Sequence, residues 1–76
     1  MTALGTRIKT LRLTAGFTQQ ELADKLGMSV TAVNNWERGR LPHARAIPKL
    51  ARTLWVEASE LATLWMSDSL GKEVKK

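Results

Sequence analysis

Side chains that can contact nucleobases are concentrated in one short segment, residues 29–38, which reads Ser-Val-Thr-Ala-Val-Asn-Asn-Trp-Glu-Arg. An asparagine amide can pair with N6 and N7 of adenine, an arginine can bind guanine or a phosphate, and small apolar groups can pack on the thymine methyl group. At about 100° of rotation per residue in a helix, one side of this segment carries Val30, Thr31, Asn34, Asn35 and Arg38. The segment therefore predicts a helix whose polar side contacts bases in a DNA major groove.

The two consecutive asparagines distinguish this helix from an ordinary solvated surface. Asparagine is a poor residue for a helix interior, so two in a row lower helix stability without a gain in packing. This favours a base contact for Asn35, whereas for Asn34 a base contact and a solvated position remain equal alternatives. A valine exposed in the first turn, Val30, also favours a contact in the groove, although single exposed apolar residues are common.

Groups that flank this helix are candidates for phosphate contacts, which fix the register of a protein on the duplex while base contacts discriminate between sequences. Gln19 is expected in the first turn of the preceding helix, where free backbone amides and the helix dipole favour an anion. The other candidates are Thr18, Ser29, Arg40 and Arg45. For each arginine alone, solvation is an equal alternative, but as a group the cations favour phosphate.

Short helices must position these residues, because apolar residues recur at helical spacing and no alternating strand pattern occurs. The five expected helices span about residues 4–15, 18–26, 29–38, 45–54 and 57–66. Thr18 and Glu21 can form a capping box at the start of the second helix. Gly16, Gly27 and Gly39 are the expected ends of the first three helices.

The second and third expected helices are separated by a very short turn around Gly27. An amphipathic helix, a short turn containing glycine and a second helix with a polar outer side form the pattern of a helix-turn-helix. In that motif the second helix enters the major groove, which is about 12 Å wide, while the first crosses the phosphate backbone. The pattern therefore predicts binding to double-stranded DNA.

Length and charge agree with a small DNA-binding domain. A chain of 76 residues permits one domain, expected over residues 1–66, with a basic, flexible tail over residues 67–76. The net charge of +5 is uneven: residues 1–52 hold nine lysines and arginines against three acidic residues, whereas residues 53–71 hold three acidic residues and no base. A basic front and an acidic back favour a polyanion that approaches in one orientation, although charge alone equally permits a solvated basic surface.

Other classes of protein find little support in the sequence. His43 stands alone, with no nucleophile at a recognisable spacing, no glycine-rich phosphate loop and no metal-ligand pattern, so neither an enzyme nor a cofactor or metal site is expected. No apolar run approaches the roughly 18 residues that a membrane span requires. The absence of cysteine permits a reducing compartment. We expect a cytoplasmic protein that binds neither a membrane nor a small molecule.

Residues 4–65 resemble the phage repressor and Cro type of helix-turn-helix domain, also called the xenobiotic-response-element (XRE) family. Residues 12–23, Arg-Leu-Thr-Ala-Gly-Phe-Thr-Gln-Gln-Glu-Leu-Ala, resemble the signature of its first two helices. Residues 33–39, Val-Asn-Asn-Trp-Glu-Arg-Gly, resemble its third helix, which ends in Trp-Glu-x-Gly. Residues 50–61 are similar to its last two helices. The resemblance implies an all-α, five-helix, lambda-repressor-like domain encoded by a bacterium or a phage.

The resemblance also implies a function: a sequence-specific transcription regulator, most simply a repressor, that binds a near-palindromic operator as a homodimer. It implies that Gln19 contacts phosphate. The resemblance also places Val30, Thr31 and Asn35 at positions that contact bases. It further implies that Arg12 and Glu37 form a partly buried ion pair between the first and third helices.

Three residues near the end of the domain leave a second function open. Trp55 occupies a position where the family usually has a small or left-handed residue such as glycine, so the turn between the fourth and fifth helices is expected to be built differently. Trp55, Trp65 and Met66 are candidates for dimer contacts, with core packing as the alternative for Trp65. The same residues could instead bind another protein, in which case the chain would be an antitoxin or a protein adaptor.

Overall fold

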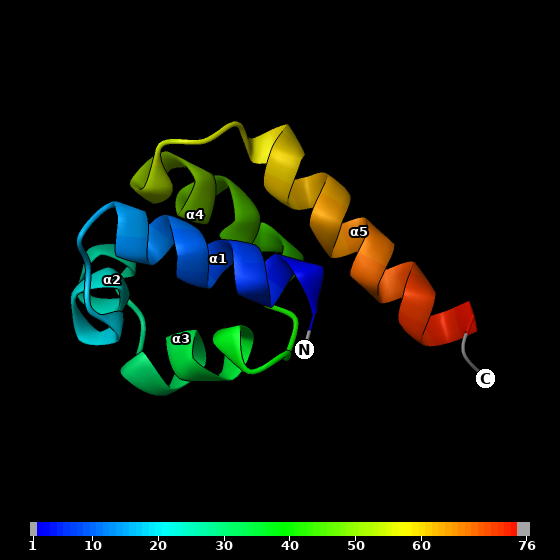
Figure 1. The fold of residues 1–76 in the computed structure, drawn as a ribbon, viewed down its shortest axis with the longest axis horizontal. Helices are drawn as coiled ribbons and strands as arrows, with labels where there is room; N and C mark the ends of the chain where they lie inside the picture. Colours follow the sequence, from blue (N-terminus) through cyan, green and yellow to red (C-terminus); the bar gives the residue numbers. More distant parts are fainter. Residues whose placement is uncertain (1, 75–76) are drawn as a thin grey trace.

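Five α-helices surround one core in the computed structural model, which describes residues 2–74 (Figure 1). They are α1 (Ala3–Thr14), α2 (Gln19–Leu26), α3 (Val30–Glu37), α4 (Ile47–Leu54) and α5 (Ala58–Val74), and a short 3-10 turn, η1 (Ala44–Ala46), precedes α4. The all-helical fold class is therefore confirmed. No helix within residues 2–74 combines the length and the apolar character needed to cross a bilayer. Residue 1 of the expected domain and residues 75–76 of the expected tail lie outside the described part.

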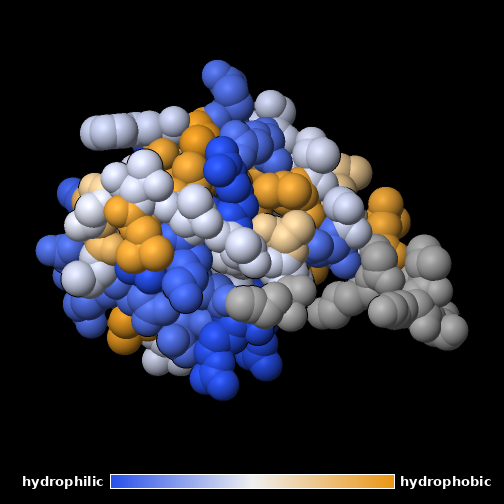
Figure 2. All heavy atoms as spheres, in the orientation of Figure 1, coloured by the Kyte–Doolittle hydropathy of each residue, from blue (hydrophilic) through white to orange (hydrophobic). Residues whose placement is uncertain are grey.

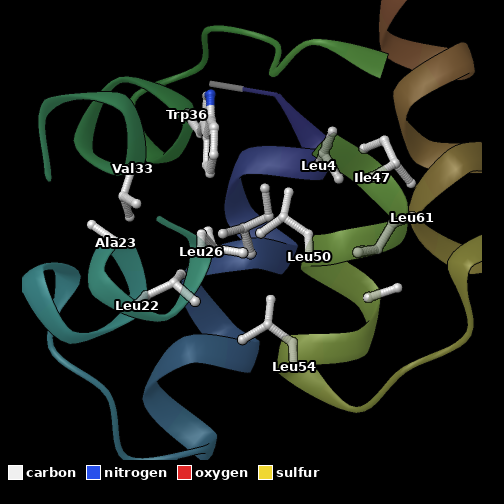
Figure 3. Close-up of a cluster of buried hydrophobic side chains, with 12 residues drawn as sticks. Leu4, Leu22, Ala23, Leu26, Val33, Trp36, Ile47, Leu50, Leu54 and Leu61 are labelled. Carbon is white, nitrogen blue, oxygen red and sulfur yellow. The ribbon is translucent and has the colours of Figure 1, made fainter. Parts of the chain in front are cut away.

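Apolar side chains from all five helices meet in the centre of the molecule (Figure 3). Complete burial of a leucine or valine side chain contributes roughly 1.5–3 kcal/mol to folding. The side chains with no exposed surface are Leu4, Ile8, Leu22, Ala23, Val33, Leu50 and Leu61. Helix α1 lies across the other helices and packs on α3 and α5, while α2 packs on α3 and α4. This packing fixes α2 and α3 in the helix-turn-helix arrangement.

The N-terminal ends of α2 and α3 confirm the capping signals of the sequence. The Thr18 hydroxyl accepts from the Glu21 amide at 3.0 Å, and the Glu21 carboxylate accepts from the Thr18 amide at 2.8 Å, so the capping box is complete. The Ser29 hydroxyl accepts from the Ala32 amide at 3.2 Å. Gly27 is left-handed, with φ of 70°. The predicted short turn between the two helices is therefore also confirmed.

The first four helices end in the same type of turn, in which an amide beyond the helix bonds a carbonyl five residues earlier. These hydrogen bonds run from Phe17 to Arg12, from Met28 to Ala23, from Arg40 to Asn35 and from Val56 to Ala51. Each turn contains one residue with positive φ, namely Gly16, Gly27, Gly39 and Trp55. The chain thus forms one Schellman-type turn on a tryptophan where the other three use glycine.

The expectation that the turn at Trp55 is built differently is wrong. Trp55 adopts the left-handed conformation, with φ of 61° and ψ of 46°. Such a backbone costs a residue with a side chain about 1–2 kcal/mol. It persists here because Val56 packs against the core and its amide bonds the Ala51 carbonyl at 3.0 Å, so the turn is fixed on both sides of Trp55.

We expect Trp55→Gly to stabilise the fold by about 1 kcal/mol, because glycine adopts a positive φ without strain. Urea unfolding followed by circular dichroism measures the change. Trp55→Ala is the matched control, since alanine removes the indole but keeps the Cβ that is strained. If both variants gained the same stability, the gain would come from loss of the exposed ring. That result would contradict backbone strain as the cause.

Helix α5 is longer than the sequence analysis predicts. We expected it to end at Met66, but it continues to Val74, so the predicted end of the fifth helix is wrong. One reason is a tertiary contact: the Asp68 carboxylate accepts from the Ala3 and Leu4 amides at 3.3 and 2.9 Å, where the positive end of the α1 dipole favours an anion. An ion pair between Arg7 and Glu60 also joins α1 to α5.

Candidate nucleic-acid interface

Helix α3 lies at an edge of the molecule, with α1 and α2 packed against its inner side (Figure 1). Its inner side chains, Val33 and Trp36, are buried. Its outer side carries Thr31 and Arg38, which are exposed, and Asn34 and Asn35, which are half-buried. The structure therefore brings four of the five candidate base-contacting residues to one accessible surface.

Val30 differs in part from the expectation of an exposed residue. It is half-buried and packs against the hydrophobic core. The reason is its place in the first turn of α3, directly after the Ser29 cap, where the helix is pressed against α2. Only part of the Val30 side chain is left to meet a ligand.

Beneath this surface, Arg12 of α1 and Glu37 of α3 form the ion pair that the resemblance implies. Arg12 Nε lies 2.6 Å from Glu37 Oε2, and Arg12 Nη2 lies 3.1 Å from Glu37 Oε1, so the pair is bidentate. The two side chains expose only 9% and 4% of their surface. Arg12 Nη1 also donates to the Phe17 carbonyl at 2.8 Å. The pair therefore joins α1, α3 and the turn that leads into α2.

Two side-chain amides extend this ion pair to the surface. Gln19 Nε2 donates to Glu37 Oε1 at 3.0 Å, and Asn34 Nδ2 donates to Gln19 Oε1 at 3.3 Å. The first residue of α2 is thereby held against α3. One Nε2 hydrogen of Gln19 remains free to donate, because a primary amide carries two donors. The bond between Gln19 and Glu37 is not predictable from the sequence, since 18 residues separate the two and no periodicity links them.

Asn35 stands apart from this network. Among the described residues, no hydrogen bond engages its side-chain amide, although its backbone carbonyl accepts from the Arg40 amide at 2.9 Å. Its carbonyl oxygen and its NH₂ group are therefore both available, as a bidentate contact with adenine requires. Of the two neighbouring asparagines, one amide is occupied within the protein and the other is open.

The charged groups around α3 are positive. Arg38, Arg40 and Arg45 are exposed, while Glu37, the acidic residue of α3, is buried and paired. Hydrophilic residues predominate over α3 on the side of the molecule shown in Figure 2. Arg40 follows α3 directly, since its amide bonds the α3 backbone, and Arg45 lies on η1. The surface can therefore accept a polyanion.

The hydroxyl groups of Thr18 and Ser29 are exposed at the starts of α2 and α3. Each hydroxyl oxygen already accepts a backbone amide as a helix cap. A hydroxyl also carries one donor. Both groups can thus bind a phosphate oxygen without giving up the cap.

The structure does not bring Trp55, Trp65 and Met66 together. Trp65 packs against the core and its Nε1 donates to the Pro42 carbonyl at 2.7 Å. Trp65 and Met66 line an apolar groove along α5, whereas Trp55, which is 86% exposed, lines a different hollow beside Phe17. The three candidate contact residues are therefore divided between two surfaces.

Comparisons with known proteins agree with this geometry. The sequence model of the helix-turn-helix family matches residues 8–61. The chain is 44% identical over 59 residues to YazB of Bacillus subtilis (strain 168), whose name describes an uncharacterized HTH-type transcriptional regulator, and the match covers 76% of this chain and 86% of YazB. No solved structure matches the chain. The chain belongs to the XRE-type helix-turn-helix family of DNA-binding transcription regulators.

Proposed function

We propose that this protein is a transcriptional repressor that binds a near-palindromic operator as a homodimer and contacts the bases of the major groove through α3. One observation carries the proposal: the outer side of α3 keeps Thr31 exposed, and among the described residues no hydrogen bond engages the Asn35 amide, whereas the neighbouring Asn34 amide donates to Gln19. Repression would follow from occupation of a promoter. A regulator of this kind acts where the DNA is, in the cytoplasm of a bacterium.

The base contacts follow from the chemistry of each side chain. Asn35 pairs with adenine, and the methyl groups of Thr31 and Val30 pack on thymine. Arg38, at the end of α3, reaches guanine or a phosphate. For Asn34, the sequence permitted either a base contact or a solvated position. We assign it a different role, the positioning of Gln19, because its amide already donates to that residue.

The phosphate contacts surround this helix. Gln19 offers its free amide hydrogen at the start of α2, where the helix dipole favours an anion. The remaining contacts are assigned to Thr18, Ser29, Arg40 and Arg45. Because Gln19 is held by Glu37 at 3.0 Å, it loses little side-chain entropy when it binds a phosphate.

The dimer contact is assigned to the apolar groove along α5. The groove has a volume of about 370 Å³ and is lined by Ile47, Ala62, Trp65 and Met66, among others. Two of the acidic residues of α5 are held within the chain, since Glu60 pairs with Arg7 and Asp68 accepts from the amides at the positive end of α1. Two such surfaces can therefore meet without strong repulsion. A two-fold dimer would place its two α3 helices about 34 Å apart, one turn of the duplex.

The experiment that tests the function is selection of bound DNA from a random pool. We expect inverted pairs of half-sites whose centres lie about 10 base pairs apart. In Asn35→Ala, the preference at one base pair in each half-site should fall by about 10–100-fold, because a bidentate contact contributes roughly 1–3 kcal/mol of discrimination. Asn34→Ala is the matched control. It should weaken binding to all sequences alike, since it disturbs Gln19 on the phosphate.

Two outcomes would contradict the proposal. Unpaired half-sites in the selected pool would exclude the homodimer. Full retention of sequence preference by the Asn35→Ala protein would exclude α3 as the element that discriminates between bases.

A further inference from the structure

Trp55 is the most exposed large apolar residue of the described chain, with 86% of its surface accessible. Its indole therefore contributes little to the core. Its backbone also carries strain, because φ is 61° at a turn where the other three helix ends have glycine. The stability of the fold therefore does not explain why tryptophan occupies this position, because the residue strains the backbone and adds no packing. Strain of this type persists where a residue has a binding role.

Trp55 stands over a groove that α3 does not form. One hollow of about 370 Å³ is lined by Phe17, Lys25, Arg52, Thr53 and Trp55. A second hollow of the same size, lined in part by Glu21 and Asp24, shares Phe17 and Lys25 with the first, so the two adjoin. The groove is built by the turn between α1 and α2, the outer side of α2 and the end of α4. We call it the Trp55 groove.

The Trp55 groove presents two aromatic rings and two cations. The Lys25 ammonium lies over the Phe17 ring, 5.3 Å from its centroid, and Arg52 is exposed beside Trp55. Within residues 2–70, neither cation takes part in an ion pair. The available positive charge beside an open apolar surface selects a ligand that combines carboxylates with an apolar group.

The nearby acidic residues are already occupied. Glu21 accepts the Thr18 amide in the capping box, and Asp24 accepts from Gln20 Nε2 at 2.9 Å. Both carboxylates keep their charge, because these donors are neutral amides, but neither lines the hollow that contains Arg52 and Trp55. A carboxylate from another molecule therefore meets Lys25 and Arg52, and no acidic side chain, among the residues that line the end of the groove near Trp55.

A duplex does not fit the aromatic part of this groove. Stacking on an exposed indole requires bases that are unpaired, and the faces of paired bases are covered within a duplex. A protein segment has no such limit, because an apolar side chain can pack against the indole while neighbouring carboxylates reach the cations. Exposed tryptophans and arginines are also the residues that most often dominate protein–protein contacts.

We propose that the Trp55 groove binds an acidic segment of another protein, in which an apolar side chain packs against the Trp55 indole and flanking carboxylates pair with Lys25 and Arg52. The segment binds while α3 remains free, since the groove contains no residue of α3. The proposal does not depend on whether the protein represses transcription or forms a dimer.

The test is selection of displayed random peptides on the full chain, in parallel with Trp55→Gly. We expect enriched peptides with aspartates or glutamates around one leucine or phenylalanine on the wild-type chain only. A synthetic peptide of the enriched sequence should bind Trp55→Gly at least about 30-fold more weakly, as for an aromatic anchor. Lys25→Gln and Arg52→Gln should each weaken it by about 2–5-fold, the effect of an exposed ion pair.

Trp55→Gly separates binding from folding, because it removes the indole and relieves the strained turn. Its Tm should rise by about 4–8 °C, so a loss of peptide binding cannot be caused by unfolding. Operator DNA binding, measured on the same variant, should change by less than about twofold. A loss of DNA affinity or of self-association would place Trp55 in one of those contacts instead and overturn the proposal. Equal enrichment on both proteins, peptides without acidic residues or no enrichment at all would also overturn it.

Discussion

Glu37→Ala is expected to lower the free energy of unfolding by about 3–5 kcal/mol, because it leaves the Arg12 guanidinium buried without its partner. The two side chains expose only 9% and 4% of their surface, so water cannot replace the lost carboxylate without opening the fold. A small domain is stable by about 5–15 kcal/mol in total. The loss is therefore a large fraction of the stability, and urea unfolding followed by circular dichroism would measure it.

The second ion pair of the structure provides the control. Arg7 and Glu60 also join two helices, but their side chains expose 40% and 38% of their surface. Glu60→Ala should therefore cost at most about 1 kcal/mol. DNA affinity of folded Glu37→Ala protein should fall less than its stability does, since the base-contacting side chains are unchanged. An unaltered Tm for Glu37→Ala, or equal losses for both variants, would show that burial of the pair does not stabilise the fold.

Operator affinity is expected to fall by about 10³-fold between 50 and 200 mM salt. If Arg38, Arg40 and Arg45 bind phosphates in each copy, a dimer neutralises six charges, and each releases condensed counterions whose entropy gain shrinks as salt rises. Further contacts would steepen the dependence towards about 10⁵-fold. Fluorescence anisotropy of labelled operator at several salt concentrations would measure the slope.

Arginine substitutions locate the source of the slope. Arg45→Gln removes two charges from a dimer, so the slope of log affinity against log salt should become shallower by about 2 units. Arg7→Gln is the matched control: Arg7 pairs with Glu60 of α5 and is assigned no phosphate contact, so its loss should leave the slope unchanged even where an unpaired Glu60 weakens the dimer. An affinity independent of salt would contradict phosphate binding and favour a protein adaptor.

Local chemistry made the helix ends and the outer side of α3 predictable. The capping box of Thr18 and Glu21, the cap at Ser29 and the glycine at position 27 each act within one helical turn, so their effect is visible in a few adjacent residues. The apolar spacing of α3 determined which side is buried, and therefore that Thr31 and Asn35 lie outside. These predictions succeeded because helix ends and amphipathic sides depend on neighbours in the sequence.

The chemistry of the interface itself was only partly predictable. The sequence favours a base contact for Asn35 but leaves Asn34 open between a base contact and a solvated position, and only the structure shows that the Asn34 amide donates to Gln19. The close approach of α1 to α3 was also invisible: a Cβ added at Gly5 would collide with the Trp36 carbonyl oxygen. Glycine at that position is therefore set by packing between helices.

By itself, the sequence determined that the chain forms short amphipathic helices, that two of them make a helix-turn-helix, and that the outer side of the third can contact bases. Only the tertiary structure decided that α5 continues past Met66 to bind α1 through Asp68, and that Trp55 keeps a left-handed turn. The Asp68 contact joins residues 64 positions apart in the chain. Periodicity and capping report interactions within a few residues, whereas such contacts form only when the whole core has packed.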